Sequence, residues 1–201
     1  MLDRAAATLI RPAIDRLASF AAGAGLGANQ MTLLGFAVGM AAAVLISNGH
    51  FLFGAAGILL SRLCDGLDGA IARRTRPTDA GGFLDIALDF VFYAAIPLAF
   101  ALADPARNAL AAALLLAAFC GTMSSFLAFA VIAAKRGMDN LAWPDKSFYF
   151  LGGLTEATET LACFIAMCIW PQLFPLLAGI FAAMCLVTTG TRIWWGWCSF
   201  S

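Results

Sequence analysis

The chain has 201 residues, of which 62% are hydrophobic and 12% are charged. Soluble domains carry about 25% charged residues, so the composition excludes an ordinary soluble protein. Lysine and arginine balance aspartate and glutamate, 12 against 12, and give no reason to expect nucleic acid as a partner. Long apolar runs between short polar breaks instead predict an all-α membrane protein, with membrane lipids around it.

The N-terminal segment combines regularly spaced apolar side chains with arginines and has no continuous apolar run. Apolar residues recur at helical spacing at Leu9, Ile10, Ala13, Ile14, Leu17 and Phe20. This pattern predicts an amphipathic helix over about residues 3–22 that lies in the membrane interface. It does not fit a secretory signal peptide.

Six apolar segments follow, and each is long enough to span a bilayer as a helix. Their predicted limits are residues 29–47, 51–74, 81–103, 108–135, 148–170 and 173–197. Turn residues such as glycine, proline, asparagine and aspartate separate the segments. No internal repeat divides the chain, so residues 1–201 are predicted to form a single transmembrane domain.

The cations between the predicted spans lie almost entirely on one side of the membrane. That side carries Arg4, Arg11, Arg16, Arg73, Arg74, Arg76, Lys135, Arg136 and Lys146. The opposite loops carry only Arg107. Because cytoplasmic loops are enriched in lysine and arginine, both termini are predicted to lie in the cytoplasm. The expected location is a bacterial-type inner (plasma) membrane.

Four aspartates interrupt the second and third predicted helices. Asp65 and Asp68 are three residues apart, and Asp85 and Asp89 are four apart, so each pair shares one face of its helix. Counted from the connecting loop, Asp65 and Asp89 lie ~12–14 Å along their helices. Asp68 and Asp85 lie ~6–9 Å along theirs. An antiparallel hairpin therefore predicts that the four carboxylates converge.

An aspartate at the centre of a spanning helix costs about 2.5–3.5 kcal/mol, so four of them require neutralisation. Protonation or ion pairing is one explanation, and Arg62 could pair with one of the four. Divalent cations are the favoured explanation, because carboxylate oxygens suit Mg²⁺ or Mn²⁺. With each helix supplying a pair of ligands, a two-metal site is the natural hypothesis.

Small residues and arginine accompany the acidic residues. Gly66 and Gly69 either allow close helix packing or let a ligand approach the backbone. Arg73 and Arg74 lie at the predicted cytoplasmic end of the same helix, where arginine anchors a helix or binds phosphate. The sequence leaves these alternatives open.

Together these residues form a longer pattern, which comprises Asp65, Asp68, Gly69, Ala72, Arg73, Gly81, Asp85 and Asp89. It closely resembles the signature of the CDP-alcohol phosphatidyltransferases, integral membrane enzymes with the same number of spans and an N-terminal interfacial helix. The resemblance covers most of the chain.

Two features depart from the family pattern. Seven residues separate Arg73 from Gly81, a shorter spacer than is usual, which should alter nucleotide contacts more than metal geometry. The family often opens its first helix with Pro-Asn-x-x-Thr, and here Ala28 precedes Asn29. By the resemblance, Asn29 and Thr32 would contact the nucleotide; alternatively they cap the helix.

The resemblance implies transfer of a phosphatidyl group from CDP-diacylglycerol to an alcohol, with release of CMP, in phospholipid biosynthesis. Asp65, Asp68 and Asp85 would be metal ligands, and Asp89 would be both a ligand and the general base. Further residues would lie against the CDP moiety, namely Gly69, Ala72, Arg73 and Thr78. The resemblance also suggests a homodimer, with an active site that opens to the cytoplasm.

Other polar residues at similar depth are candidates for the acceptor pocket, namely Ser125, Lys135, Arg136, Glu156, Glu159 and Arg192. The glutamates, expected three apart on the fifth helix, suit a cationic or polyhydroxylated alcohol, or pair with Arg62 or Arg192. The cations Lys135, Arg136, Lys146 and Arg192 favour a phosphorylated acceptor instead. For Ser125, hydrogen bonding within or between helices is the favoured role. The class of acceptor stays open.

Two other functions would also place acidic residues or glycines in a membrane. A divalent-cation transporter explains the aspartates but not the spacing of Gly69, Ala72 and Arg73, and the sequence shows no repeats. A membrane scaffold packing through Gly35 and Gly39 leaves the aspartates unexplained, and such a motif more often joins helices within one bundle.

Overall fold

The computed structural model describes residues 12, 14–21, 23–75, 77–137 and 154–201. These residues form helices and connecting turns, without a β-strand among them. In chain order the helices are α2 (Ala28–Ser47), α3 (Phe51–Arg74), α4 (Asp79–Ala103), α5 (Pro105–Lys135), α7 (Ala157–Ile169), the short 3-10 helix η2 (Pro171–Leu173) and α8 (Phe174–Phe200). The prediction of an all-α fold is confirmed for this part of the chain.

Two of the helices begin at residues that satisfy their free backbone N–H groups. Thr78 precedes α4, and its hydroxyl accepts a hydrogen bond from the N–H of Gly81 at 3.1 Å. Asp104 precedes α5 and accepts from the N–H of Arg107 at 3.2 Å, while Pro105 occupies the first turn, where no N–H is needed. Like α2 and α3, these two helices begin and end within a few residues of the predicted limits.

The prediction for the fifth span is wrong in its N-terminal part. Helix α7 begins at Ala157, and residues 154–156 precede it in non-helical backbone. The N–H of Glu156 donates a hydrogen bond to the carboxylate of Glu159 at 3.2 Å, which fixes the start of the helix. Glu159 therefore lies in α7 and Glu156 does not, contrary to expectation. Residues 148–153 lie outside the described part.

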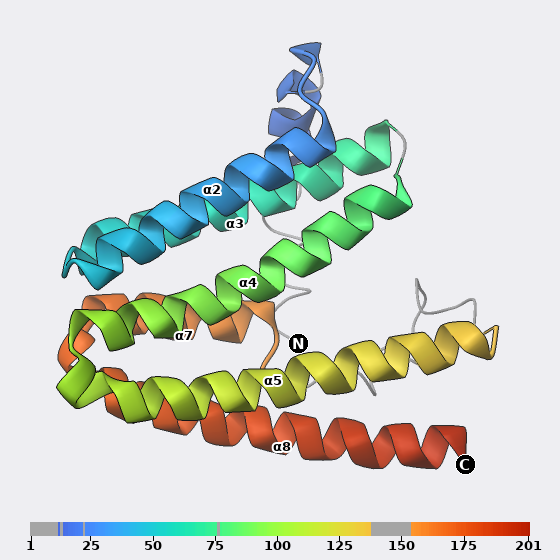
Figure 1. Ribbon diagram of the computed structural model, residues 1–201. Helices are drawn as coiled ribbons and strands as arrows, with labels where there is room; N and C mark the ends of the chain where they lie inside the picture. Colours follow the sequence, from blue (N-terminus) through green and yellow to red (C-terminus); the bar gives the residue numbers. More distant parts are fainter. Residues whose placement is uncertain (1–11, 13, 22, 76, 138–153) are drawn as a thin grey trace.

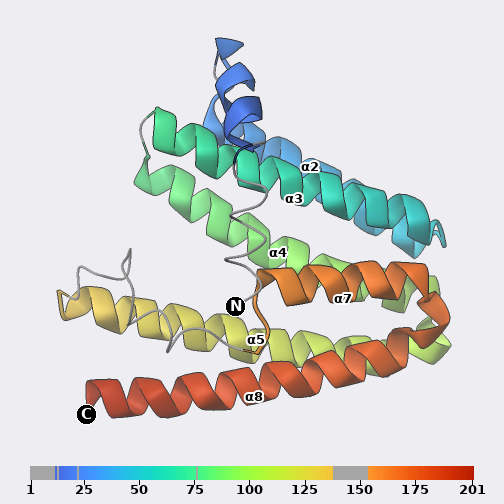
Figure 2. The ribbon, with the colours of Figure 1, turned by 180° about the vertical axis from the view of Figure 1, so that it is seen from behind.

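The helices form one bundle in which α4 lies between two helix pairs. Helix α2 pairs with α3, α5 pairs with α8, and α4 contacts both α2 and α5 (Figure 1). Helix α7 lies on the other side of α4 and packs against α3 (Figure 2). Aromatic rings fill the interior: the centroid of Phe100 lies 4.6 Å from that of Phe174, and Phe119 lies 6.2 Å from Phe164. The first contact joins α4 to α8 and the second joins α5 to α7. Tyr93 of α4 lies 6.4 Å from Phe119 and 6.0 Å from Phe164, so aromatic contacts hold α4 against α5, α7 and α8.

Two glycines let α2 approach its neighbours closely. A Cβ atom on Gly35 would lie 2.9 Å from the Cβ of Cys64, and one on Gly39 would lie 2.6 Å from Cδ2 of Phe92. Both distances are shorter than van der Waals contact, so a larger residue would displace α3 or the Phe92 ring. The Gly35-x3-Gly39 motif therefore joins helices within one bundle, as small residues commonly do in membranes.

Four helical segments are long and apolar enough to cross a membrane. They are Ala28–Ser47, Asp79–Ala103, Pro105–Lys135 and Pro171–Phe200. Helix α3 has 24 residues but carries charged residues in its middle and last turns, and α7 has only 13 residues. Within the described residues, four of the six predicted spans therefore have the length and composition of a membrane span, and those at α3 and α7 are not confirmed.

The segment before α2 is helical at residues 14–21 and packs across the ends of α2 and α3 (Figure 1). Its buried side chains are Ala18 and Ala21, which join a small apolar cluster with Ile71. Leu17 and Phe20, expected on the apolar face, are 47% and 80% exposed. Residues 1–11 lie outside the described part, so the interfacial position of this segment stays a prediction.

Replacement of Gly39 by alanine should destabilise the bundle, because the new methyl group would overlap the buried Phe92 ring. Overpacking of this kind costs about 1–3 kcal/mol of unfolding free energy. The measurement is thermal unfolding of the detergent-solubilised protein. Gly179→Ala is the matched control, because no atom lies within 4 Å of a Cβ at that position of α8. Equal melting temperatures for the two variants would contradict the packing role.

Candidate functional site

The α3–α4 hairpin brings three of the four aspartates together. One carboxylate oxygen each from Asp65, Asp68 and Asp85 lies within 4.8 Å of the other two. Asp68 is buried with 5% exposure, and the other two are partly buried. Two ligands on opposite sides of one Mg²⁺ ion lie about 4.2 Å apart, so small side-chain rotations would let these oxygens share a divalent cation. The predicted convergence is confirmed for this acidic group.

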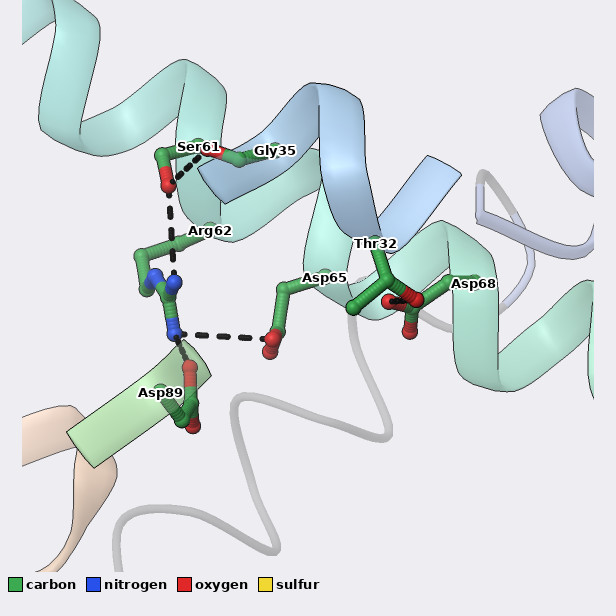
Figure 3. A network of polar contacts seen from close by, with 7 residues as sticks. All are labelled: Thr32, Gly35, Ser61, Arg62, Asp65, Asp68 and Asp89. Atoms are coloured by element: carbon green, nitrogen blue, oxygen red, sulfur yellow. Dashed lines mark hydrogen bonds and ion pairs between the residues drawn. The ribbon is translucent and has the colours of Figure 1, made fainter. Parts of the chain in front are cut away.

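Thr32 of α2 supports the buried member of the group. Its hydroxyl lies 2.6 Å from Oδ2 of Asp68 and 3.1 Å from the carbonyl oxygen of Ala28 (Figure 3). The hydrogen bond to the carboxylate orients Asp68 and partly compensates its burial. Because Gly27 precedes α2 as its N-cap, the alternative that Asn29 or Thr32 caps the helix is wrong.

The fourth aspartate, Asp89, is paired with Arg62. Nη1 of Arg62 lies 2.5 Å from Oδ1 of Asp89 and 3.5 Å from Oδ1 of Asp65 (Figure 3). The guanidinium also stacks on an aromatic ring, with Cζ 4.1 Å from the centroid of Phe92. Asp89 therefore lies outside the group of three, and Arg62 joins it to Asp65, which is a member of that group. An ion pair and a carboxylate group that could hold a metal ion are both present here, whereas the sequence presented ion pairing and metal binding as alternatives.

A cavity of about 160 Å³ opens beside the acidic group, between the first turn of α2, the last turns of α3 and the first turns of α4. It is lined by Ala28, Asn29, Thr32, Asp68, Gly69, Ala72, Pro77, Thr78, Gly81, Gly82 and Asp85. Five of the six residues expected against the CDP moiety are in this lining, and Arg73 is the exception. The resemblance thus selected residues that are distant in sequence but adjacent in space.

The glycines near the aspartates have different neighbours. A Cβ on Gly81 would lie 2.8 Å from Oδ1 of Asn29, so glycine lets the α2 and α4 ends meet at the cavity. A Cβ on Gly66 would lie 3.0 Å from Cδ1 of Ile14 in the N-terminal segment. Gly66 therefore packs against protein, whereas Gly69 lines the cavity.

A second cavity, of about 290 Å³, lies on the other side of Asp89. It is lined by Asp89, Phe90, Tyr93, Phe119, Thr122, Met123, Phe126, Thr155, Glu156, Ala157, Thr160, Cys185 and Arg192. Arg192 donates a hydrogen bond to the carbonyl oxygen of Thr122 at 3.1 Å. Carboxylates, hydroxyl groups and one guanidinium therefore surround a space that begins at Asp89. A narrow space lined by both Asp85 and Asp89 lies between the two cavities.

Several residues predicted for the acceptor pocket are engaged elsewhere. Ser125 bonds the carbonyl oxygen of Thr122 at 3.1 Å, as favoured from the sequence. Arg136 donates to the carbonyl oxygens of Ser199 and Phe200 and so joins the ends of α5 and α8. Lys135 is exposed, and neither it nor Glu159 lines the second cavity. Only Glu156 and Arg192 of the six candidates do.

Sequence reasoning missed two polar residues of the second cavity, Tyr93 and Thr122. Tyr93 follows Asp89 by four residues on α4, so helical periodicity could have placed it on the same face. Thr122 gives no comparable signal, because α5 is distant in sequence from the acidic motif.

Comparison with known proteins gives consistent matches. Residues 26–196 match the family model of the CDP-alcohol phosphatidyltransferases. The inner membrane protein YnjF of Escherichia coli is 51% identical over 197 residues, which cover 98% of this chain and 96% of YnjF. The archaetidylinositol phosphate synthase of Methanothermobacter thermautotrophicus is 46% identical over 81 residues, 40% of this chain and 38% of that protein.

The fold also matches that of a solved enzyme. The crystal structure of Mycobacterium tuberculosis phosphatidylinositol phosphate synthase with CDP-DAG bound gives a TM-score of 0.67 at 23% identity, over 92% of this chain and 93% of that one. The structure of the same enzyme with manganese and citrate gives a TM-score of 0.67 over 92% and 88%. At this identity the match establishes the fold.

Replacement of Thr32 by valine should weaken the acidic group, since it keeps the shape of the side chain and removes the donor to Asp68. A buried carboxylate that loses such a partner costs about 1–3 kcal/mol of unfolding free energy. Thermal unfolding in detergent with a chelator present measures the effect. Thr32→Ser retains the hydroxyl and should lose less stability. If the serine and valine variants were equally destabilised, the hydrogen bond would not be the cause.

Proposed function

The chain belongs to the CDP-alcohol phosphatidyltransferase family, and we propose that it transfers a phosphatidyl group from CDP-diacylglycerol to an alcohol in phospholipid biosynthesis. The observation that carries this proposal is the position of the 160 Å³ cavity, whose lining combines the expected nucleotide residues with Asp68 and Asp85. A nucleotide there would place its diphosphate beside the acidic group. The chain would act as an integral protein of an inner membrane, like the relative named for that location.

Asp65, Asp68 and Asp85 would hold the divalent cation, Mg²⁺ or Mn²⁺. Their close oxygens and the preference of these ions for carboxylates support the assignment. When bound, such an ion neutralises charge on the diphosphate and favours in-line displacement. Manganese in the solved fold relative is consistent with the same class of ion. Asn29, Gly69, Ala72, Arg73 and Thr78 would contact the CDP moiety.

Asp89 would act as the general base. It borders both the narrow space beside Asp85 and the second cavity, so it lies between the donor and acceptor positions. The alcohol oxygen forms a bond to the phosphorus that carries the diacylglycerol group, the bond from that phosphorus to the CMP oxygen breaks, and Asp89 receives the alcohol proton. The prediction that Asp89 is also a metal ligand is not part of this proposal, because Asp89 is paired with Arg62.

We propose that α3 and α7 also lie in the membrane, as part of six spans with both termini in the cytoplasm. The last turns of α3 and α5, with Arg73, Arg74 and Lys135, lie at the same end of the bundle as the end of α8 (Figure 1). Exposed tryptophans near that end, Trp194 and Trp197, suit a membrane interface. Arg4, Arg11, Arg76 and Lys146, which contributed to the predicted orientation, lie outside the described residues. A homodimer also stays a prediction.

We propose that the second cavity takes an acceptor alcohol without a phosphate group. Its described lining contains Asp89 and Glu156 against a single guanidinium, that of Arg192. Because Asp89 is already paired with Arg62, the lining adds one carboxylate and one guanidinium, those of Glu156 and Arg192. A phosphomonoester carries about −1.5 to −2 charge at pH 7 and would find no surplus positive charge there. Hydroxyl groups from Thr122, Thr155 and Thr160 instead suit a polar neutral or zwitterionic alcohol.

Asp89→Asn should reduce transfer by about 10²–10⁴-fold, because amide nitrogen cannot accept the alcohol proton. The measurement is CMP release from CDP-diacylglycerol by purified protein with Mg²⁺ or Mn²⁺, compared with the same reaction in EDTA. Asp79→Asn, an exposed position at the start of α4, is the matched control and should retain activity. Near-normal transfer by the Asp89 variant would remove the base assignment. Manganese uptake into vesicles without CMP release would favour a transporter.

Matched acceptor pairs test the chemistry of the second cavity. Glycerol with glycerol 3-phosphate, inositol with inositol phosphate, and serine with phosphoserine differ only in the phosphate group. We expect the unphosphorylated member to give a kcat/KM higher by about tenfold or more, a difference of about 1.4 kcal/mol. In the Glu156→Gln variant, the ratio of kcat/KM for the unphosphorylated acceptor to kcat/KM for the phosphorylated one should be closer to one than in the wild-type protein. Two relatives are named archaetidylinositol phosphate synthase and phosphatidylinositol phosphate synthase, so inositol phosphate is included in the panel, and activity confined to it would refute the proposal.

A further inference from the structure

Arg62 is a cation placed deep in the bundle. It lies twelve residues before Arg74, the last residue of α3, or about 18 Å along the helix. Its side chain is only 14% exposed. An arginine at such depth is unfavourable unless specific partners compensate its charge, so its surroundings indicate its role.

The surroundings of Arg62 fix the guanidinium in one place. Nη1 contacts Asp89 and Asp65, and Nη2 donates to the hydroxyl of Ser61 at 3.4 Å (Figure 3). Cζ of the guanidinium lies 4.1 Å from the ring centroid of Phe92 and 5.7 Å from that of Tyr93. Carboxylates and aromatic faces are both favourable neighbours of a guanidinium.

The two carboxylates that Arg62 joins are also those that a second metal ion would need. Asp65 belongs to the group of three oxygens that suits one ion, and Asp89 is outside that group. A second ion using Asp89 would lie in the narrow space that Asp65, Asp85 and Asp89 line, and Arg62 lines the same space, with Nη1 within 3.5 Å of both Asp65 and Asp89. Two positive charges a few ångströms apart in a low-dielectric interior repel strongly, so the guanidinium and a second ion exclude one another.

We propose that Arg62 replaces the second divalent cation, so that the site works with one metal ion and one fixed guanidinium. The inference rests on the proposed function, and it assigns a residue outside the family pattern to the reaction centre. The single ion would be held by Asp65, Asp68 and Asp85. Arg62 would supply the other positive charge, and it would hold Asp89 in position at the entrance of the second cavity.

The test is the number of Mn²⁺ ions bound by the full-length protein in lipid nanodiscs, measured by equilibrium dialysis and by the electron paramagnetic resonance signal of free Mn²⁺. Wild-type protein should bind about one ion per chain, and Arg62→Met should bind about two, because Asp89 is then free to act as a ligand. Arg62→Lys keeps the charge and should stay near one. Arg107→Met is the control, since Arg107 bonds the carbonyl oxygen of Gln172 in another part of the bundle.

The outcomes separate this inference from the proposed function. Two ions in the wild-type protein would overturn the role of Arg62 and leave the enzymatic proposal standing. An Arg62→Met variant that still binds one ion would overturn it too. Binding of no ion by the wild-type protein would remove both. If Arg62→Met fails to fold, as judged by thermal unfolding, the number of ions bound by the wild-type protein and by Arg62→Lys decides the question: about one per chain supports the inference, and two per chain contradicts it.

Discussion

The structure depends on the neutralisation of aspartate side chains inside an apolar bundle. A linked series of contacts achieves this on one side: the absent side chain of Gly39 leaves room for the Phe92 ring, the ring supports the Arg62 guanidinium, and the guanidinium pairs with Asp89. On the other side, Thr32 holds Asp68 at 2.6 Å. Charge compensation therefore depends on close packing. Neither the ion pair nor the hydrogen bond would form if α2, α3 and α4 were further apart.

The position of α4 makes the arrangement usable for chemistry. Its first turn closes the cavity that contains Asn29 and Gly69, and its second and third turns carry Asp85 and Asp89. The next turn carries Tyr93 into the second cavity. One helix thus runs from the proposed nucleotide position through the acidic group to the proposed acceptor position. The aromatic core that fixes α4 against α5, α7 and α8 also fixes the distance between the two cavities.

Charge is distributed differently on the two sides of Asp89. In the acidic group of three, Thr32 bonds Asp68 and Arg62 lies 3.5 Å from Asp65, so the group still suits a cation, whereas Asp89 is paired with Arg62 at 2.5 Å. The second cavity then contributes Glu156 and Arg192, one charge of each sign. The positions of two partly buried cations therefore underlie both proposals. Arg62 underlies the proposal of a single metal ion, and Arg192 underlies the proposal of an acceptor without phosphate. Arg136, which could have served an acceptor phosphate, instead bonds the carbonyl groups at the end of α8.

The sequence by itself determined the helical class, the limits of α2 to α5, the convergence of Asp65, Asp68 and Asp85, and most of the residues around the first cavity. The helical class, the helix limits and the convergence of the aspartates depend on apolar periodicity and on spacing within one hairpin, both of which are local. The residues around the first cavity came from the resemblance to the family pattern. Sequence reasoning misplaced the start of α7, because an apolar run does not reveal where backbone N–H groups find a carboxylate such as that of Glu159. Tertiary structure alone decided that Arg62 would take Asp89, that Arg136 would turn away from the acceptor side, and that Thr122 would line the second cavity. Each of these depends on which helices pack together, and a side chain's partners on another helix are not encoded in its own neighbourhood of the chain.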